Sequence, residues 1–446
     1  MGLTRTEIES LSERILGLVE ADDAELRIGD SEDLQIRYAN NDITTNGLVD
    51  RVRINLSVSY GKRSASISVN QTDGATLREA VEKVQAMAKL APEDPEHMPP
   101  VEPRDYAEPL TFSEATAAMR PEDALAQVRP VIESARTAAV DSAGYLERSV
   151  GGHAFANSRG LFEYQRSTRV DFSLTARAAE GNGSGWASTQ VTDVGELDLA
   201  PVGERAIEKA LASRNARERA PGRTTVVLEA AAVRDLLGLL AWNLDRRDFD
   251  EGRSFLNGLV GEGEDESPLG KSLFGDRATL FSDPLYEPAP CSTHSGGLPR
   301  THTPWIENGV LRHLAAGRFW ARKQGLDPLP HPGNLVMPGD GESNEELIAR
   351  VEDGVLVTRL WYLRMVQPQT LLYTGLTRDG TFAIKNGEVA GPVKNFRFNE
   401  SPVNVLRNIV ASGKPERVLG SEGSSPVHAP PLVVEEFNLS SVSEAS

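Results

Sequence analysis

The chain has 446 residues, of which 39% are hydrophobic and 25% are charged, as is ordinary for a globular protein of several domains. Its formal net charge of −18 excludes nucleic acid as the main partner, because phosphate binding requires a basic surface. No apolar run approaches the roughly 18 residues of a membrane span. No export signal is expected at the N-terminus. The single cysteine excludes intrachain disulfides and predicts a cytoplasmic location.

The first segment, residues 1–95, is predicted to be an α/β domain. Thr4 and Glu7 fit a capping box, and apolar residues follow at helical spacing, which predicts a helix over about residues 4–22. A second helix is predicted from Thr76 for the same reasons. Between the two helices, extended or alternating runs predict strands, the last two joined by a hairpin, at 24–29, 34–40, 51–60 and 63–71.

A proline-rich stretch separates the first segment from the next. Six prolines lie within residues 92–109, and they can neither continue a helix nor pair inside a sheet, so we place a domain boundary there. The central segment, residues 110–220, is predicted to be α+β. Its predicted helices lie at 122–139 and 202–217, and its predicted strands lie at 145–156, 161–178 and 185–191.

The C-terminal segment, residues 222–446, is predicted to be β-rich after an opening strand at 224–229 and a very apolar helix at 230–243. Asn-Gly and Asp-Gly turns divide it into short strands whose close spacing requires antiparallel pairing. The predicted strand breaks include Asp379-Gly380. A helix is predicted from Ser401-Pro402 to about 412, and an edge strand at 431–437. The chain as a whole is predicted to be α+β, with antiparallel or mixed sheets and flanking helices.

Residue chemistry alone does not assign an activity. None of the seven histidines has a histidine one helical turn away, as a zinc-protease helix requires. His294, His302 and His313 lie in or near one Gly/Pro/Thr-rich loop, and they form one alternative metal site. Cys291 with His294 or His302 would be the nucleophile and base of an autonomous hydrolase. An unpaired thiol and scattered histidines are the simpler interpretation, since nothing local marks an oxyanion site. The acidic run 262–266 is predicted to be solvated.

Several runs in the expected order resemble proteins of the TldD/PmbA family, at 38–45, 306–311, 354–362, 374–382 and 392–401. The resemblance implies a metalloprotease family. Its TldD-type members hold zinc with an H-E-x-x-x-H helix and a cysteine near the C-terminus. They pair with a TldE (PmbA) subunit into a hollow dimer, where peptides add to a sheet in extended form.

The residues aligned with the zinc helix lack its ligands in this chain. Gly238, Leu239 and Asn243 stand at those positions, and the run 420–424 replaces the cysteine region. The resemblance therefore implies a TldE/PmbA-like subunit that binds no cofactor itself, with zinc expected in a TldD-type partner. The expected assembly is a heterodimer with that partner or a homodimer, acting on peptides. An autonomous hydrolase using the Cys291 loop and a non-enzymatic peptide-binding homodimer are the alternatives.

A basic and aromatic run at 358–366 is the predicted peptide-binding segment. Arg359, Tyr362 and Arg364 are its candidate contacts, because such residues are unusual in so acidic a chain and extended peptides can add to a strand. Since Trp361 and Tyr362 point to opposite faces of a strand, at least one of them is expected to pack in a core. Alanine at Arg359 or Arg364 is expected to leave stability near wild type.

Overall fold

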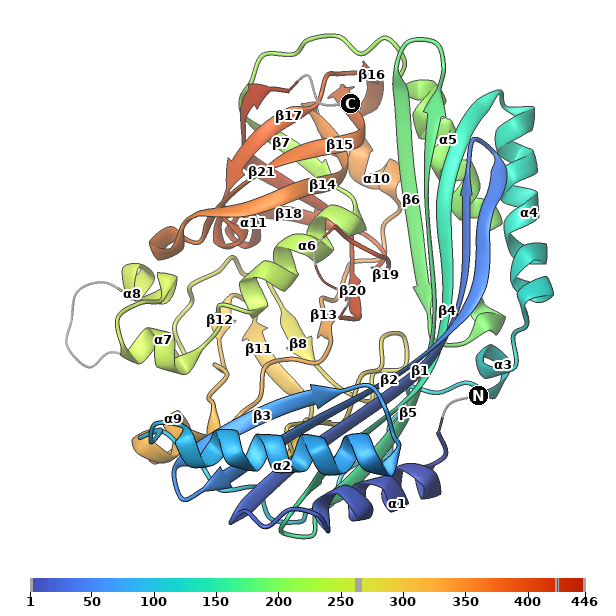
Figure 1. Ribbon diagram of the computed structural model, residues 1–446. Helices are drawn as coiled ribbons and strands as arrows, with labels where there is room; N and C mark the ends of the chain where they lie inside the picture. Colours follow the sequence, from blue (N-terminus) through green and yellow to red (C-terminus); the bar gives the residue numbers. More distant parts are fainter. Residues whose placement is uncertain (1–2, 261–266, 422, 424, 444–446) are drawn as a thin grey trace.

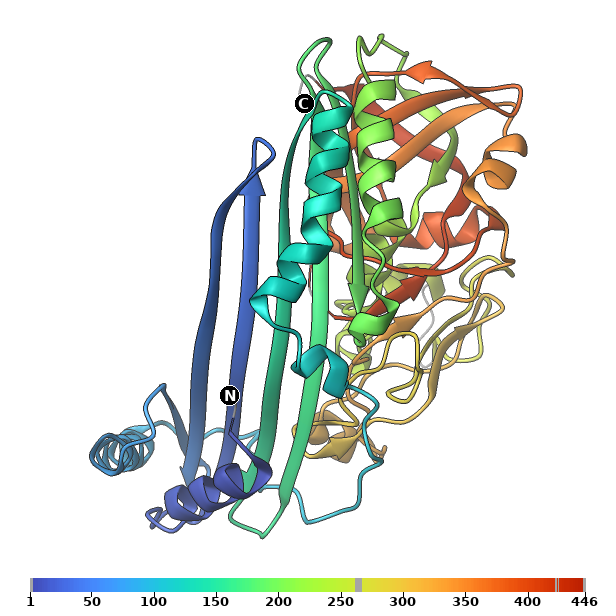
Figure 2. The same cartoon turned by 90° about the vertical axis from the view of Figure 1, so that its right-hand side faces the viewer.

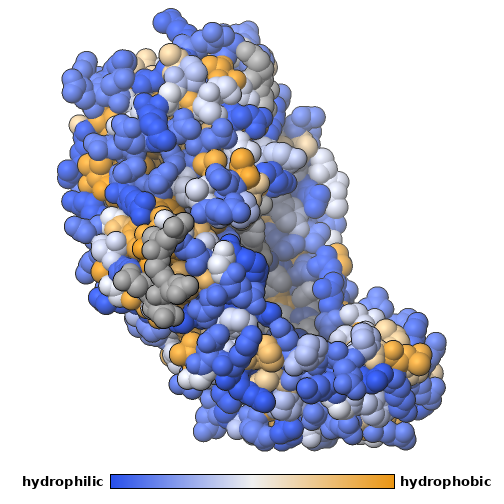
Figure 3. Space-filling model, turned by 90° about the vertical axis from the view of Figure 1, so that its left-hand side faces the viewer, coloured by the Kyte–Doolittle hydropathy of each residue, from blue (hydrophilic) through white to orange (hydrophobic). Residues whose placement is uncertain are grey.

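The computed structural model describes residues 3–260, 267–421, 423 and 425–443 (Figure 1). The acidic run 262–266 therefore lies outside the described residues. The architecture is α+β with antiparallel and mixed sheets, as the sequence predicted. Within the described residues, no helix combines the length and the apolar character that crossing a membrane requires. The face seen in Figure 3 is mostly hydrophilic, with its hydrophobic residues in small separate groups.

One antiparallel sheet of six strands runs through the first and central segments, in the order β3-β2-β1-β4-β5-β6. Strand β1 pairs with β2 on one side and with β4 on the other along most of its length. The two segments are thus joined in one sheet across the proline-rich stretch. The strands are β1 (Asp23–Ala39), β2 (Asp42–Tyr60), β3 (Arg63–Val69), β4 (Val140–Asn157), β5 (Phe162–Ala178) and β6 (Gly183–Val191).

Helices cover one face of this sheet, and the C-terminal segment lies against the other face (Figures 1 and 2). Successive side chains of a strand point to opposite faces, so Leu26 and Ile28 pack under helices while Arg27 faces the C-terminal segment. The predicted capping box of Thr4 and Glu7 is confirmed. The helices of this half are α1 (Arg5–Leu16), α2 (Gly74–Leu90), α3 (Glu114–Ala117), α4 (Pro121–Thr137) and α5 (Ala200–Ala212), with the 3-10 turn η1 (Val194–Glu196).

The C-terminal segment forms a seven-stranded sheet in which β14 pairs with β7 and also with β15, so five strands close into a ring. The strands of this sheet are β7 (Gly222–Leu228), β14 (Asp353–Gln367), β15 (Leu372–Lys385), β16 (Glu388–Pro392), β17 (Phe396–Glu400), β18 (Ile409–Ser412) and β21 (Leu432–Val442).

A second C-terminal sheet has the order β12-β11-β8-β13-β20-β19, and β9 and β10 form a separate pair. These strands are β8 (Leu280–Ser282), β9 (His294–Ser295), β10 (Leu298–Pro299), β11 (Thr303–Glu307), β12 (Val310–Leu311), β13 (Leu335–Val336), β19 (Glu416–Arg417) and β20 (Val427–Ala429). The helices are α6 (Ala230–Ala241), α7 (Arg246–Asp250), α8 (Phe255–Val260), α9 (Arg318–Gln324), α10 (Asn344–Ala349) and α11 (Pro402–Arg407), with the 3-10 turn η2 (Pro368–Thr370).

Three predictions about strands were wrong because strand pairing overrides local signals. The two strands predicted at 24–29 and 34–40 are one strand, β1, whose polar middle is held by β2 and β4. There Asp33 is buried and accepts a 2.6 Å hydrogen bond from Ser149 of β4. Asp379-Gly380 lies inside β15 and ends no strand. The predicted edge strand at 431–437 belongs to β21, which lies between β7 and β17 inside the sheet.

The helix predicted to run from Ser401 to about 412 ends at Arg407. Residues 409–412 form β18 instead, because β21 offers them a pairing edge. The start of this helix was predicted correctly. Ser401 is the N-cap, its side chain accepts a hydrogen bond from the Val403 amide, and Pro402 occupies the first helical turn.

Candidate functional site

Helix α6 lies at the centre of the C-terminal segment, between its two sheets (Figure 1). Most of its residues are buried, as the very apolar composition predicts. Two charged residues, Arg234 and Asp235, are nevertheless only 3% and 1% exposed. They form an ion pair with 3.1 Å between Arg234 Nη1 and Asp235 Oδ1.

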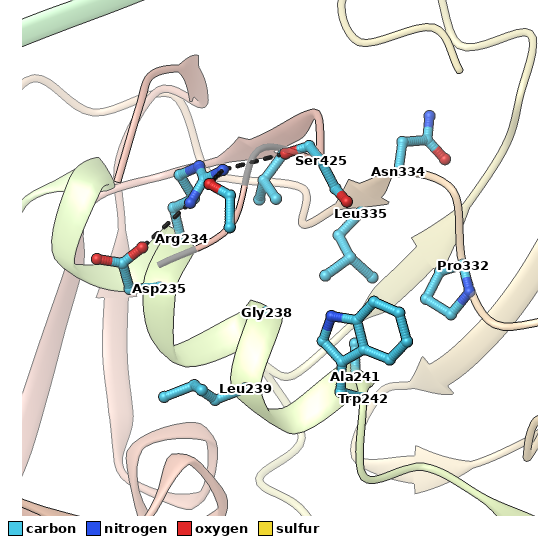
Figure 4. A pocket seen from close by; sticks show the side chains of 12 residues that line it. Arg234, Asp235, Gly238, Leu239, Ala241, Trp242, Pro332, Asn334, Leu335 and Ser425 are labelled. Carbon is cyan, nitrogen blue, oxygen red and sulfur yellow. Dashed lines mark hydrogen bonds and ion pairs between the residues drawn. The ribbon is translucent and has the colours of Figure 1, made fainter. Parts of the chain in front are cut away.

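The positions that the resemblance aligns with zinc ligands offer no ligand set. Gly238 and Leu239 have no donor atoms, and the Asn243 side chain donates a 2.8 Å hydrogen bond to the Leu239 carbonyl. A pocket of about 250 Å³ lies over this turn of α6. Figure 4 shows Trp242, Leu335 and other apolar side chains around it. The residues present therefore do not fit a zinc ion.

Arg234 and Asp235 hold the segment that follows β19 over α6. Arg234 donates hydrogen bonds to the carbonyl oxygens of Gly423 and Ser425 at 2.9 and 3.1 Å. Figure 4 shows Arg234 directed toward Ser425. Asp235 accepts bonds from the backbone amide and the hydroxyl of Ser421 at 2.9 and 2.7 Å. Positions 422 and 424 lie outside the described residues. The segment that replaces the expected cysteine region is thus bound to the helix by a buried ion pair.

A larger cleft of about 770 Å³ adjoins the pocket and shares three lining residues with it. One wall is the open face of the six-stranded sheet, with residues of β1, β4 and β5. The opposite wall is made of C-terminal loops and the start of α9. The shared residues are Trp242, Pro332 and Ser425. Gly238 and Leu239 thus line a pocket that adjoins a cleft large enough for part of a peptide.

The charged residues that line the cleft are mostly basic, whereas the chain as a whole is acidic. Among the described residues, the lining has one acidic residue, Glu25, against six arginines: Arg27, Arg166, Arg169, Arg300, Arg318 and Arg417. Burial lowers the pKa of His153 to about 4, so this lining residue is neutral near pH 7. His331 lies across the cleft against Trp242, with 5.3 Å between ring centroids. The cleft is thus a basic hollow in an acidic protein.

The loop residues of the alternative site do not converge. Burial raises the pKa of the Cys291 thiol to about 11, which opposes a thiolate nucleophile. His294 is buried beside Glu163, with 3.2 Å between Nε2 and Oε2. His302 is exposed beside Asp283, and His313 contacts the Pro304 carbonyl. Among the described residues, no group of three or more His, Cys, Asp or Glu side chains is placed to hold a metal ion.

The residues predicted to contact peptide line neither cavity. Arg359 is half-buried beneath Trp361, with 5.1 Å from its guanidinium carbon to the ring centroid, and it donates a 2.7 Å bond to Asp379. Trp361 and Tyr362 are 37% and 58% exposed, so the expectation that one of them packs in a core was wrong. Tyr362 has a positive φ of 56°, at a break in the β14–β15 register that turns both rings outward. Arg364 is exposed and lies over the Tyr362 ring.

Comparison with known proteins identifies the family. Three family models of PmbA/TldA metallopeptidase domains match this chain. Domain 1 matches residues 24–88, the central domain matches 94–214 and the C-terminal domain matches 221–441. The chain belongs to the PmbA/TldD metallopeptidase family. A relative from Methanothermobacter thermautotrophicus, named a metalloprotease, is 27% identical over 293 residues. That match covers 59% of this chain and 60% of the relative.

Solved structures share the fold of this PmbA/TldD-family chain. TldE from Thermococcus kodakarensis has a TM-score of 0.83 at 18% identity, covering 97% of this chain and 99% of that protein. A proposed DNA gyrase modulator from Bacteroides thetaiotaomicron has a TM-score of 0.84 at 19% identity, covering 98% and 100%. A similar protein from Thermotoga maritima has a TM-score of 0.81 at 18% identity, covering 97% and 99%.

Sequence reasoning missed the residues that shape the site. Arg234 and Asp235 are adjacent charged residues in an otherwise apolar helix. That pattern in the sequence could have indicated a buried ion pair. The arginines of the cleft carried no such signal. They come from widely separated segments, and only the fold brings them to one cavity.

Proposed function

We propose that this TldE/PmbA-like chain is the non-catalytic subunit of a two-subunit peptidase. In this role it binds no zinc and contributes a cleft that holds peptide, while a TldD-type partner supplies the metal. The observation that carries the proposal is the α6 turn at Gly238 and Leu239, which lines the pocket adjoining the cleft. With the Asn243 amide bonded to the helix backbone, this turn has no set of zinc-binding atoms.

The autonomous hydrolase is less well supported by the same geometry. It requires an ionised Cys291 and a histidine base in contact with it. Burial raises the pKa of that thiol, and the hydrogen bond given by its Sγ goes to the Ser292 carbonyl at 3.5 Å. His294 lies instead against Glu163. The other alternative, a non-enzymatic homodimer that binds peptide, is tested by the assembly experiment described below.

Purified chain is expected to contain no stoichiometric zinc. The physical reason is the absence of ligand atoms at Gly238 and Leu239, while the Asn243 amide is engaged with the helix backbone. Elemental analysis of protein prepared without chelators measures this directly. One tightly held zinc per chain, lost when His294 and His302 are replaced by alanine, would favour the autonomous hydrolase.

A surface suited to a partner lies along β2. Residues 42–51 are exposed, and β3 pairs with β2 only from Ile54 to Tyr60, so in the described structure the earlier part of β2 is a sheet edge. This stretch carries the exposed apolar side chains Ile43, Leu48 and Val49. Long unpaired edges with apolar side chains favour pairing with another chain.

The chain is expected to form a dimer in solution and to exchange into a heterodimer with a TldD-type partner. Co-expression, size exclusion and a peptidase assay of the isolated and mixed proteins test this expectation. Leu48→Glu is expected to weaken the dimer, because it places a charge on the exposed apolar edge of β2.

Leu90→Glu is the matched control for this surface, since Leu90 is 86% exposed at the end of α2, away from the β2 edge. It is expected to leave the dimer unchanged. Full activity of the TldD-type partner in the absence of this chain would contradict the subunit role.

A further inference from the structure

The cleft described above contains arginines of two kinds. Three of the six have a carboxylate within ion-pair distance: Arg27 with Glu25, Arg166 with Glu114 and Arg169 with Asp171. The other three are half-buried, and within the described residues their hydrogen bonds go only to neutral oxygen atoms. These are Arg300, Arg318 and Arg417, and we call them the unneutralised arginines.

Each unneutralised arginine is held in place by the protein. Arg300 donates to the His294 carbonyl at 2.8 Å. Arg318 donates to the Pro99 carbonyl. Arg417 donates from Nε to the Gln190 side chain at 2.9 Å and from Nη1 to the Thr192 hydroxyl at 2.8 Å. Guanidinium groups fixed by neutral acceptors keep their whole charge available to a ligand.

Within the described residues, the electrostatic cost of burying these three charges is only partly compensated. Burial lowers the pKa of all three unneutralised arginines, and that of Arg417 falls to about 10. Glu25 acts on the pKa of Arg318, and Asp171 and Glu196 act on that of Arg417. Glu25 and Asp171 are each ion-paired with another arginine. All three arginines are charged at neutral pH, and an anion entering the cleft would compensate them.

We propose that the cleft selects acidic peptides, with Arg300, Arg318 and Arg417 binding carboxylate groups of the peptide. This inference rests on the proposed function, because it names the class of peptide that the same cleft would hold. Guanidinium groups match carboxylates in geometry, and a charged hydrogen bond in a half-buried site is strong. The net charge of −18 repels acidic molecules elsewhere on the surface, so the attraction is confined to the cleft.

Calorimetric titration of the full chain, alone and with its TldD-type partner, tests the proposal. The probes are N-acetylated, C-amidated decapeptides of alternating Glu and Ala, Gln and Ala, or Lys and Ala. The Glu peptide is expected to bind about tenfold more tightly than the Gln peptide, with the Lys peptide weakest. Added salt should reduce the difference. A Gln peptide with a free C-terminal carboxylate shows whether side chains or the chain terminus supply the anion.

Arg318→Gln and Arg417→Gln are each expected to weaken binding of the Glu peptide about tenfold while leaving the Gln peptide nearly unaffected. Arg417→Lys keeps the charge and is expected to recover part of the affinity. The control is Arg350→Gln, which removes an exposed arginine that is paired with Glu342 and lies outside the cleft. Melting temperatures of all variants establish that they are folded.

Equal affinity for the Glu and Gln peptides would overturn this inference and leave the subunit role in place. Undiminished binding of the Glu peptide in both glutamine variants would also overturn it, as would tighter binding of polyphosphate or a DNA oligonucleotide than of any peptide. Peptide turnover by the chain alone would contradict the subunit role, but it would not contradict the preference of the cleft for acidic peptides.

Discussion

Asp235→Ala is expected to destabilise the protein by about 3–5 kcal/mol, the usual result of removing one partner from a buried ion pair. Arg234 would remain 3% exposed after losing its ion pair with Asp235. The amide and hydroxyl of Ser421 would lose their acceptor as well. Differential scanning calorimetry measures the loss as a lower melting temperature. Limited proteolysis is expected to cut faster near Ser421, because the contact that holds this segment to α6 is removed.

The control for this variant is Glu307→Ala, which removes a half-exposed carboxylate paired with Arg312 on the β11–β12 hairpin. It is expected to change stability by less than about 1 kcal/mol. Asp235→Asn keeps some hydrogen bonding to Ser421. Its loss of stability is expected to lie between those of Asp235→Ala and Glu307→Ala. A melting temperature for Asp235→Ala equal to that of Glu307→Ala would show that the pair does not hold the segment.

Arg359→Ala is expected to cost about 3 kcal/mol, because it removes the main partner of a carboxylate that is 1% exposed. This differs from the expectation drawn from the sequence, which treated Arg359 as an accessible strand-end residue. In the structure its guanidinium lies 4.6 Å from the Trp186 ring centroid of β6 and bonds to Asp379 of β15. Arg359 thus joins the two halves of the molecule, and its loss should lower the melting temperature.

Arg364→Ala is the matched comparison, since Arg364 lies on the same strand and is exposed. Its loss is expected to cost less than about 1 kcal/mol. A peptidase assay of the reconstituted pair completes the comparison. If Arg364→Ala lowers turnover at unchanged stability, the original placement of peptide at 358–366 is supported. If both variants melt like the wild type, the joining role of Arg359 is wrong.

Local signals predicted where the longer helices begin, but they did not predict the short helices α3, α7, α8, α9 and α10. The Thr4 capping box, the apolar helix at 230–241 and the N-cap at Ser401 follow from spacing within a few residues, and all appear in the structure. Strand lengths were predicted poorly. Asp33 is polar and buried in the middle of β1, and the hydrogen bond that makes this possible comes from Ser149, which is distant in sequence.

By itself, the sequence determined the starts of several helices, the α+β class and the family, and it predicted that Gly238, Leu239 and Asn243 provide no zinc site. These features depend on the identity of single residues and on the spacing of neighbouring ones, and both can be read from the sequence. Only the tertiary structure decided that Arg359 is half-buried and that Arg300, Arg318 and Arg417 line one cleft. Burial and the sharing of a cavity depend on which strands pair across long separations. Because the six-stranded sheet spans the proline-rich stretch, no local pattern in the sequence could reveal that cleft.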